Sequence, residues 1–159
     1  MIRKATIQDI RQIHGLLQNF ANKGELLPRP LSSLYDHVRD YVVYEPEQGC
    51  IAGCCALQIC WEDLAEIRSL AVSEPHWSRG VGSRLLAFAL DEARKFKIRK
   101  VFALTYRPGF FERHGFAVVD KSELPQKIWA DCLHCVKFPD CDEIAMMREV
   151  DPEPGEQAG

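Results

Sequence analysis

The arrangement of apolar and polar residues predicts two long amphipathic helices. In the first, apolar side chains return every three or four positions between Thr6 and Gly24, and Asp9 suits the first turn of a helix. In the second, one apolar stripe runs from Val81 to Ala93. A period near 3.6 residues is typical of a helix that buries one face, so we expect both helices to pack on a core.

Shorter apolar runs outside these two helices predict strands. The run CIAGCCALQI, residues 50–59, holds no charge, which is typical of a strand buried on both faces. Further strands are expected at residues 2–5, 41–44, 64–72, 100–105, 116–120 and 143–150.

Two shorter helices complete the pattern. One is expected from Ser32 or Ser33 to about Arg39, and the other over residues 108–115, where Gly115 ends it. Strands that alternate with helices predict one mixed α/β domain over residues 1–150. The acidic tail that follows, residues 151–159, is rich in proline and glycine, and we expect it to be disordered.

Composition narrows the classes of partner. The 159 residues carry a formal net charge of −3, whereas a dedicated nucleic-acid binder shows a basic excess. No apolar run reaches the roughly 18 residues of a membrane-spanning helix. The start, MIRKATIQDI, is basic but lacks a hydrophobic stretch behind it, so we expect no secretory signal and a cytoplasmic location.

Seven cysteines are many for this length, and without an export signal we expect reduced thiols. Four, at positions 50, 54, 55 and 60, lie in or beside the apolar run and suit small core side chains. The other three, with His134 nearby, are Cys132, Cys135 and Cys141. Zinc is an alternative there, but structural zinc takes four ligands, so buried or redox-sensitive free thiols are favoured.

A glycine-containing turn precedes the second long helix and is a candidate anion site. It reads Trp77-Ser78-Arg79-Gly80-Val81-Gly82-Ser83. A P-loop needs Gly-Lys-Ser/Thr at its end, and a dinucleotide fingerprint needs a small residue where Leu85 stands, so neither motif fits. Main-chain N–H groups at a helix N-terminus still favour a phosphate-like group, although a simple tight turn is the alternative.

Three ordered motifs resemble the Gcn5-related N-acetyltransferase (GNAT) family. The turn matches the family's Gln/Arg-x-x-Gly-x-Gly/Ala loop except that Trp77 stands in the first position, AEIRSLAV resembles the fourth strand, and FFERHGF resembles a later helix-to-strand motif. The opening IRKATIQDI is similar to the first strand and helix. The resemblance implies a GNAT fold, with a mixed sheet of six or seven strands flanked by about four helices, and acetyl-CoA as co-substrate held by its pyrophosphate on residues 77–83.

The resemblance also implies roles in acetyl transfer. A bulge in the fourth strand would free the main-chain N–H groups of Leu70, Ala71 and Val72 for the thioester carbonyl and pantetheine. Glu66 would be the general base, and a surface pair with Arg68 is the alternative. Many relatives have a tyrosine where this chain has Phe111, so Tyr106 or a water would supply the general acid.

The C-terminal third, with LPQKIW, the spaced cysteines and CDEIAM, resembles the short, stand-alone bacterial N-acetylglutamate synthases, as does LLPRPLSSLY near the N-terminus. This implies L-glutamate as acceptor and a place in arginine biosynthesis. Two carboxylates require cationic partners, for which we rank Arg29 and Lys127 first and Arg68 next, with Arg107 a further candidate.

Alternatives remain open at this point. They are a protein or peptide N-acetyltransferase, a non-catalytic acetyl-CoA-binding regulatory module, and a metal- or redox-sensing domain. We expect a small-molecule substrate, no nucleic acid and no membrane partner, with a homodimer left open.

Overall fold

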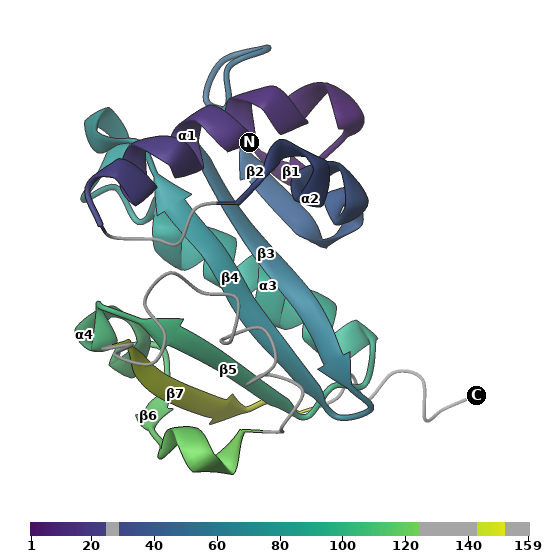
Figure 1. Cartoon of the computed structure of the whole chain (residues 1–159), viewed down its shortest axis with the longest axis vertical. Coiled ribbons are helices and arrows are strands. Elements are labelled where there is room, and N and C mark those ends of the chain that lie inside the picture. Colours follow the sequence, from purple (N-terminus) through teal and green to yellow (C-terminus); the bar gives the residue numbers. More distant parts are fainter. Residues whose placement is uncertain (25–28, 125–142, 152–159) are drawn as a thin grey trace. The chain divides into compact units, whose positions relative to one another are not determined.

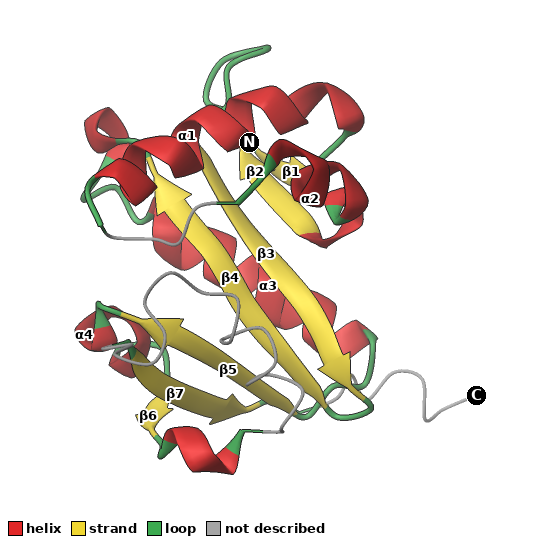
Figure 2. Cartoon of the chain, viewed as in Figure 1, coloured by secondary structure: helices red, strands yellow, loops and turns green. Residues whose placement is uncertain are grey.

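A computed structural model describes residues 1–24, 29–124 and 143–151. In this part of the chain seven strands form one sheet in the order β1-β2-β3-β4-β5-β7-β6. Four α-helices accompany the sheet (Figures 1 and 2). The expected α/β architecture is thereby confirmed. The strands are β1 (Ile2–Lys4), β2 (Tyr41–Tyr44), β3 (Gly53–Trp61), β4 (Leu64–Val72), β5 (Lys100–Thr105), β6 (Ala117–Val118) and β7 (Ile144–Glu149). The helices are α1 (Ile10–Asn22), α2 (Leu31–Asp36), α3 (Val81–Lys95) and α4 (Pro108–Glu112).

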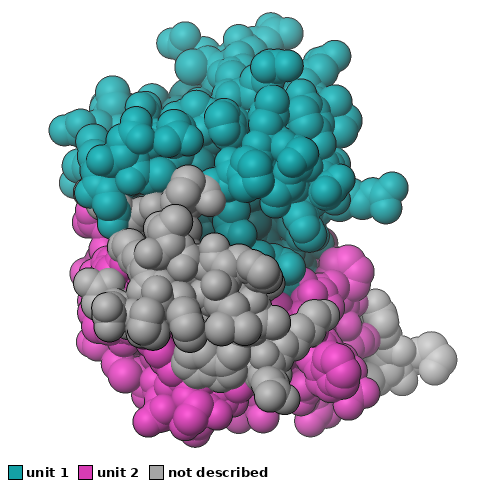
Figure 3. Space-filling model, viewed as in Figure 1, with its two compact units in different colours: residues 1–58, 67–92 teal, residues 59–66, 93–159 magenta. Residues whose placement is uncertain are grey.

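The chain divides into two compact units, coloured separately in Figure 3. Unit 1 comprises residues 1–58 and 67–92. Its strands β1, β2 and β3 are antiparallel, and the apolar stripe of α1 packs on this part of the sheet. The periodic apolar residues of the sequence therefore form the buried face of α1. On β3, Gly53 leaves room for α3, because a Cβ there would lie 3.2 Å from Leu85 Cδ1. Figure 1 accordingly shows α1 in front of β3 and α3 behind it.

Unit 2 comprises residues 59–66 and 93–159. Strand β7 pairs antiparallel with β5 on one side and with β6 on the other. A separate apolar core fills this unit, built from Cys60, Leu64, Phe102, Leu124 and Ala145. The expectation of a single domain over residues 1–150 stays a prediction.

Several element boundaries differ from those expected. The apolar run at residues 50–59 becomes strand only from Gly53, because the N–H groups of Cys50 and Ala52 bond to turn and strand carbonyls of Glu47 and Tyr44 instead. Cys50 is exposed, so its expected place in a core is wrong, whereas the other three cysteines of that group are buried.

Helix α2 and strand β6 also differ from the expected bounds. Helix α2 begins at Leu31 with Pro30 as its N-cap, since Ser33 N donates to Pro30 O at 3.0 Å, and it ends at Asp36 rather than near Arg39. The expected strand at 116–120 is confined to β6. Within the described residues, no helix combines the length and the apolar character needed to cross a membrane.

Candidate active site

Strand β4 contains a residue in the left-handed conformation. Ser69 has φ of 54°, a conformation that costs a non-glycine residue about 1–2 kcal/mol. It stands directly before Leu70, Ala71 and Val72, the residues expected to offer main-chain N–H groups. The left-handed residue lies where the sequence resemblance expects a bulge in the strand.

The turn before α3 is also left-handed, at Ser78 (φ 65°) and Gly80 (φ 74°). Helix α3 starts where Arg84 N donates to Gly80 O at 3.1 Å. The first N–H groups of an α-helix have no partner inside the helix, and the helix dipole adds partial positive charge there. This end of α3, with Val81, Gly82 and Ser83 at its start, is suited to an anion.

Trp77 ties this turn to the end of β4. Its indole Nε1 donates to Val72 O at 2.6 Å, while the side chain is 43% exposed. The residue that departs from the family motif thus joins the two backbone segments expected to hold the co-substrate. Arg79, between the two left-handed residues, is exposed.

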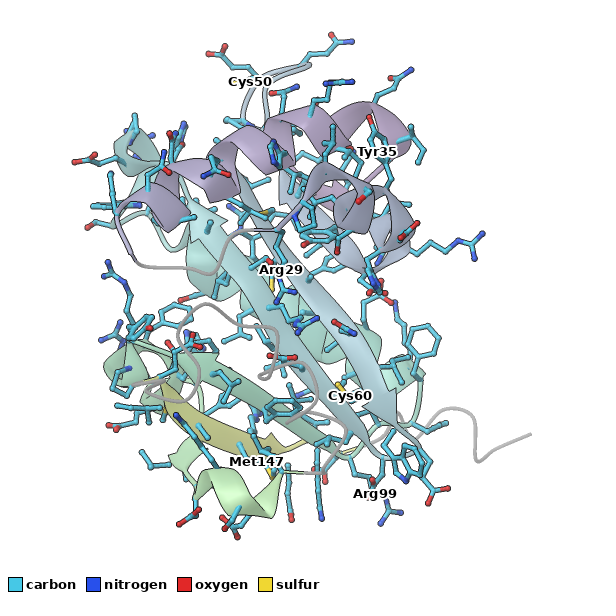
Figure 4. The ribbon with its side chains drawn as sticks, in the orientation of Figure 1. Arg29, Tyr35, Cys50, Cys60, Arg99 and Met147 are labelled. Atoms are coloured by element: carbon cyan, nitrogen blue, oxygen red, sulfur yellow. The ribbon has the colours of Figure 1, made fainter. Side chains whose placement is uncertain are left out.

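A small hollow in unit 1 brings together two arginines that the sequence singled out. Its volume is about 260 Å³, including the part open to solvent. Arg29, drawn over the sheet in Figure 4, comes from the segment before α2, and Arg68 comes from β4. The lining residues are Arg29, Ser33, His37, Asp40, Tyr41, Ala56, Gln58 and Arg68.

Hydrogen bonds fix several of these side chains. Arg68 Nη1 donates to Gln58 Oε1. His37 Nδ1 lies 3.2 Å from Asp40 Oδ2, and burial raises the pKa of the Asp40 carboxyl despite this contact. The phenol of Tyr41 donates to Ser69 Oγ at 3.2 Å, and burial raises the pKa of Tyr41 to about 12. The hollow therefore offers two guanidinium groups with one nearby carboxylate.

The expected acid–base residues lie in unit 2. Glu66 is 7% exposed, so its carboxylate is removed from bulk water, as a base working near neutrality requires. It precedes Arg68 by two positions in β4. Tyr106 is half-buried just after β5. Phe111 is buried against the rings of Phe110 and Phe116, so it belongs to the packing of α4.

Other predicted residues stand apart or lie outside the described residues. Lys127 and the cysteines Cys132, Cys135 and Cys141 are outside, as is His134. Within the described ranges, histidines, cysteines and carboxylates form no group that suits a metal ion. Arg107 is exposed immediately before α4.

Several residues of the hollow escaped sequence reasoning, namely Ser33, His37, Asp40, Tyr41, Ala56 and Gln58. The apolar run YVVY predicted a strand but gave no indication that Tyr41 would line a site. The sequence carries no signal for this residue, because it is burial that obliges a tyrosine hydroxyl to find a hydrogen-bond partner.

Comparison with known proteins agrees with this geometry. Residues 10–116 match the model of the acetyltransferase (GNAT) family. An uncharacterized N-acetyltransferase of Chlorobaculum tepidum is 38% identical over 147 residues, or 92% of this chain and 94% of that protein. An amino-acid acetyltransferase of Mycobacterium tuberculosis is 33% identical over 131 residues, or 81% of this chain and 75% of that protein.

A solved structure gives the same picture at the level of the fold. N-acetylglutamate synthase from Neisseria gonorrhoeae, complexed with coenzyme A and N-acetyl-glutamate, matches with a TM-score of 0.82 at 30% identity. The match covers 94% of this chain and 34% of that longer chain.

Proposed function

Because the chain belongs to the acetyltransferase (GNAT) family, we propose that it transfers the acetyl group of acetyl-CoA to the α-amine of L-glutamate. Acetyl-CoA as the acetyl donor follows from the family. The acceptor is the new element, and the relative named amino-acid acetyltransferase and the neighbouring synthase complexed with N-acetyl-glutamate support it.

The observation that carries this proposal is the pair of arginines in one hollow. Arg29 and Arg68 are 39 positions apart in the sequence, yet they line the same small space. Arginine binds carboxylates through two parallel N–H bonds, and glutamate carries two carboxylates.

We propose that residues of both units divide the chemistry between them. N–H groups after Ser69 would hold the thioester carbonyl, and the α3 N-terminus would hold the diphosphate. Glu66 takes the proton of the attacking amine as the new C–N bond forms. The C–S bond then breaks, and the leaving thiolate takes up a proton from Tyr106 or from water.

The direct test is thiol release by the purified chain with acetyl-CoA and single amino acids. We expect release with L-glutamate that exceeds release with L-glutamine, which has nearly the same shape but one carboxylate fewer. Release only with peptides would establish the alternative of a protein N-acetyltransferase. Acetyl-CoA binding without release for any amine would establish a non-catalytic module.

Arginine variants test the acceptor site itself. Arg68→Ala and Arg29→Ala should each raise the KM for glutamate about tenfold or more, because a charge-assisted hydrogen bond contributes about 1.5–3 kcal/mol. Arg99→Ala is the matched control, since Arg99 is exposed before β5 (Figure 4) and should leave the KM unchanged. Equal effects of all three variants would contradict the site.

A further inference from the structure

The left-handed turn at Ser69 is held by side chains from two neighbouring strands. Tyr41 on β2 donates its phenol proton to Ser69 Oγ at 3.2 Å, and the thiol of Cys54 on β3 donates to Ser69 O at 3.2 Å. A non-glycine residue keeps a left-handed conformation inside a strand only where its surroundings fix it. These two hydrogen bonds are the restraint.

Both hydrogen-bond donors are buried and keep their protons. Tyr41 and Cys54 are buried, and they come from strands paired in register, with Tyr41 opposite Ala56 and Val43 opposite Cys54. Burial raises the pKa of both the phenol and the thiol, so each keeps the proton that it donates throughout neutral and moderately alkaline solution.

Tyr41 also borders the hollow of Arg29 and Arg68. Tyr41 therefore lines the proposed acceptor space and also contacts the turn in β4 through its hydroxyl. The residues after that turn, Leu70 and Ala71, are those whose N–H groups we propose to hold the thioester and pantetheine.

We infer that Tyr41 is a positioning residue: through Ser69 it fixes the left-handed turn in β4 and so aims the N–H groups that follow at acetyl-CoA. The inference rests on the proposed binding of acetyl-CoA along β4, and it is independent of which amine accepts the acetyl group. Tyr41 acts through Ser69 rather than on the reacting atoms.

The test measures the dissociation constant of acetyl-CoA by calorimetry. Tyr41→Phe keeps the ring and removes the hydroxyl, and Ser69→Ala removes the acceptor. Each should raise the dissociation constant about 3- to 10-fold, as expected for a hydrogen bond of about 0.5–1.5 kcal/mol. The double variant should lose no more than either single one, because both remove the same contact.

A rescue separates positioning from general stability. Glycine adopts positive φ without strain, so Ser69→Gly added to Tyr41→Phe should bring the dissociation constant back toward the wild-type value. Tyr44→Phe is the matched control, since Tyr44 lies at the other end of β2 with its ring edge-on to His76, and it should bind acetyl-CoA normally.

Two results would overturn the inference: a Tyr41→Phe variant that melts at lower temperature yet binds acetyl-CoA as the wild type does, or effects that add in the double variant. A wild-type chain that binds acetyl-CoA but acetylates no amino acid would instead refute the proposed function alone.

Discussion

At the scale of single residues, Glu66 carries the sharpest prediction. It is a buried carboxylate in the strand that also supplies Arg68. A general base contributes about 10²–10⁴-fold to a rate, so Glu66→Gln should lower kcat/KM about 100-fold at pH 7. The loss should shrink at pH 9, where more of the acceptor is already free amine. The measurement is kcat/KM against pH for both proteins.

A matched control for this prediction is Glu62→Gln. Glu62 is exposed between β3 and β4, four positions before Glu66, and its loss should leave the pH profile unchanged. An equal loss of rate at every pH in Glu66→Gln would contradict a role as base and indicate a purely structural carboxylate.

Residue-scale prediction from the sequence singled out positions that a motif or a charge marks, and their roles stay predictions. Arg29 and Arg68 were named from the chemistry of a dicarboxylate, and both line the hollow. Tyr41 was missed because burial, not residue type, makes its hydroxyl important. Sequence spacing does not reveal that the side chains of residues 41 and 69 meet over the intervening strand β3.

At the scale of elements, an ion pair joins β1 to the start of α1. Arg3 donates from Nη1 to Asp9 Oδ2 at 2.8 Å and from Nη2 to Asp9 Oδ1 at 3.0 Å, and Thr6 N donates to Asp9 Oδ2 at 2.8 Å. These bonds, led by that of Arg3, hold the pKa of the Asp9 carboxyl below its usual value.

The lowered pKa sets the sign of a pH effect. A carboxyl whose pKa is lower in the folded state stabilises the fold above its unfolded value of about 3.9, and the stabilisation is lost as the pH falls through the folded-state pKa. Asp9→Asn should thus cost about 1.5–3 kcal/mol of unfolding free energy at pH 7 and much less at pH 2.

Urea unfolding at the two pH values measures the Asp9 effect. Asp36→Asn, at an exposed position of α2, should leave the unfolding free energy unchanged at both pH values and serves as the control. A difference between Asp9→Asn and wild type that stayed the same at both pH values would show that charge does not cause it.

The connection from β4 to α3 gives a second prediction at this scale. Trp77→Phe keeps an aromatic ring but removes the bond to Val72 O. Loss of one hydrogen bond of about 0.5–1.5 kcal/mol that orders the turn should raise the KM for acetyl-CoA about 3- to 10-fold. Trp61→Phe, 59% exposed on β3, is the control in the same assay. If the KM for acetyl-CoA were unchanged in Trp77→Phe, the indole hydrogen bond would not order the turn.

Periodicity predicted most elements because one buried face makes the apolar pattern visible. It placed α1, α3, β4 and β5 closely. The prediction from periodicity failed where buried residues are not part of a strand, since Ile51 and Ala52 are buried without belonging to β3. At α2 the serines suggested a cap, but the carbonyl of Pro30 already starts the helix.

At the scale of the whole molecule, the described residues of each compact unit form an apolar core of their own, which the hydrophobic pattern alone did not distinguish. Unit 1 is centred on residues of α1, β2 and β3, and unit 2 on residues of β5 and β7 together with the β3–β4 hairpin. Strands β3 and β4 and helix α3 each contribute to both units. A sequence without contact information does not assign one strand to two cores.

Ligand binding should stabilise the whole chain through the turn before α3. At 100 times its dissociation constant, a ligand adds about 2.7 kcal/mol to the unfolding free energy, which for a chain of this size raises Tm by about 5–10 °C. Acetyl-CoA should produce this shift, and S-acetyl-pantetheine, which lacks the diphosphate, should not at the same concentration.

The variant Gly80→Ala should abolish the Tm shift, because Gly80 has φ of 74° and alanine would reorient the N–H groups that follow. Gly15→Ala, on the exposed face of α1 with no atom within 4 Å of the added Cβ, should keep the full shift. If acetyl-CoA stabilised the Gly80→Ala protein as much as the wild type, the diphosphate would not bind at this turn.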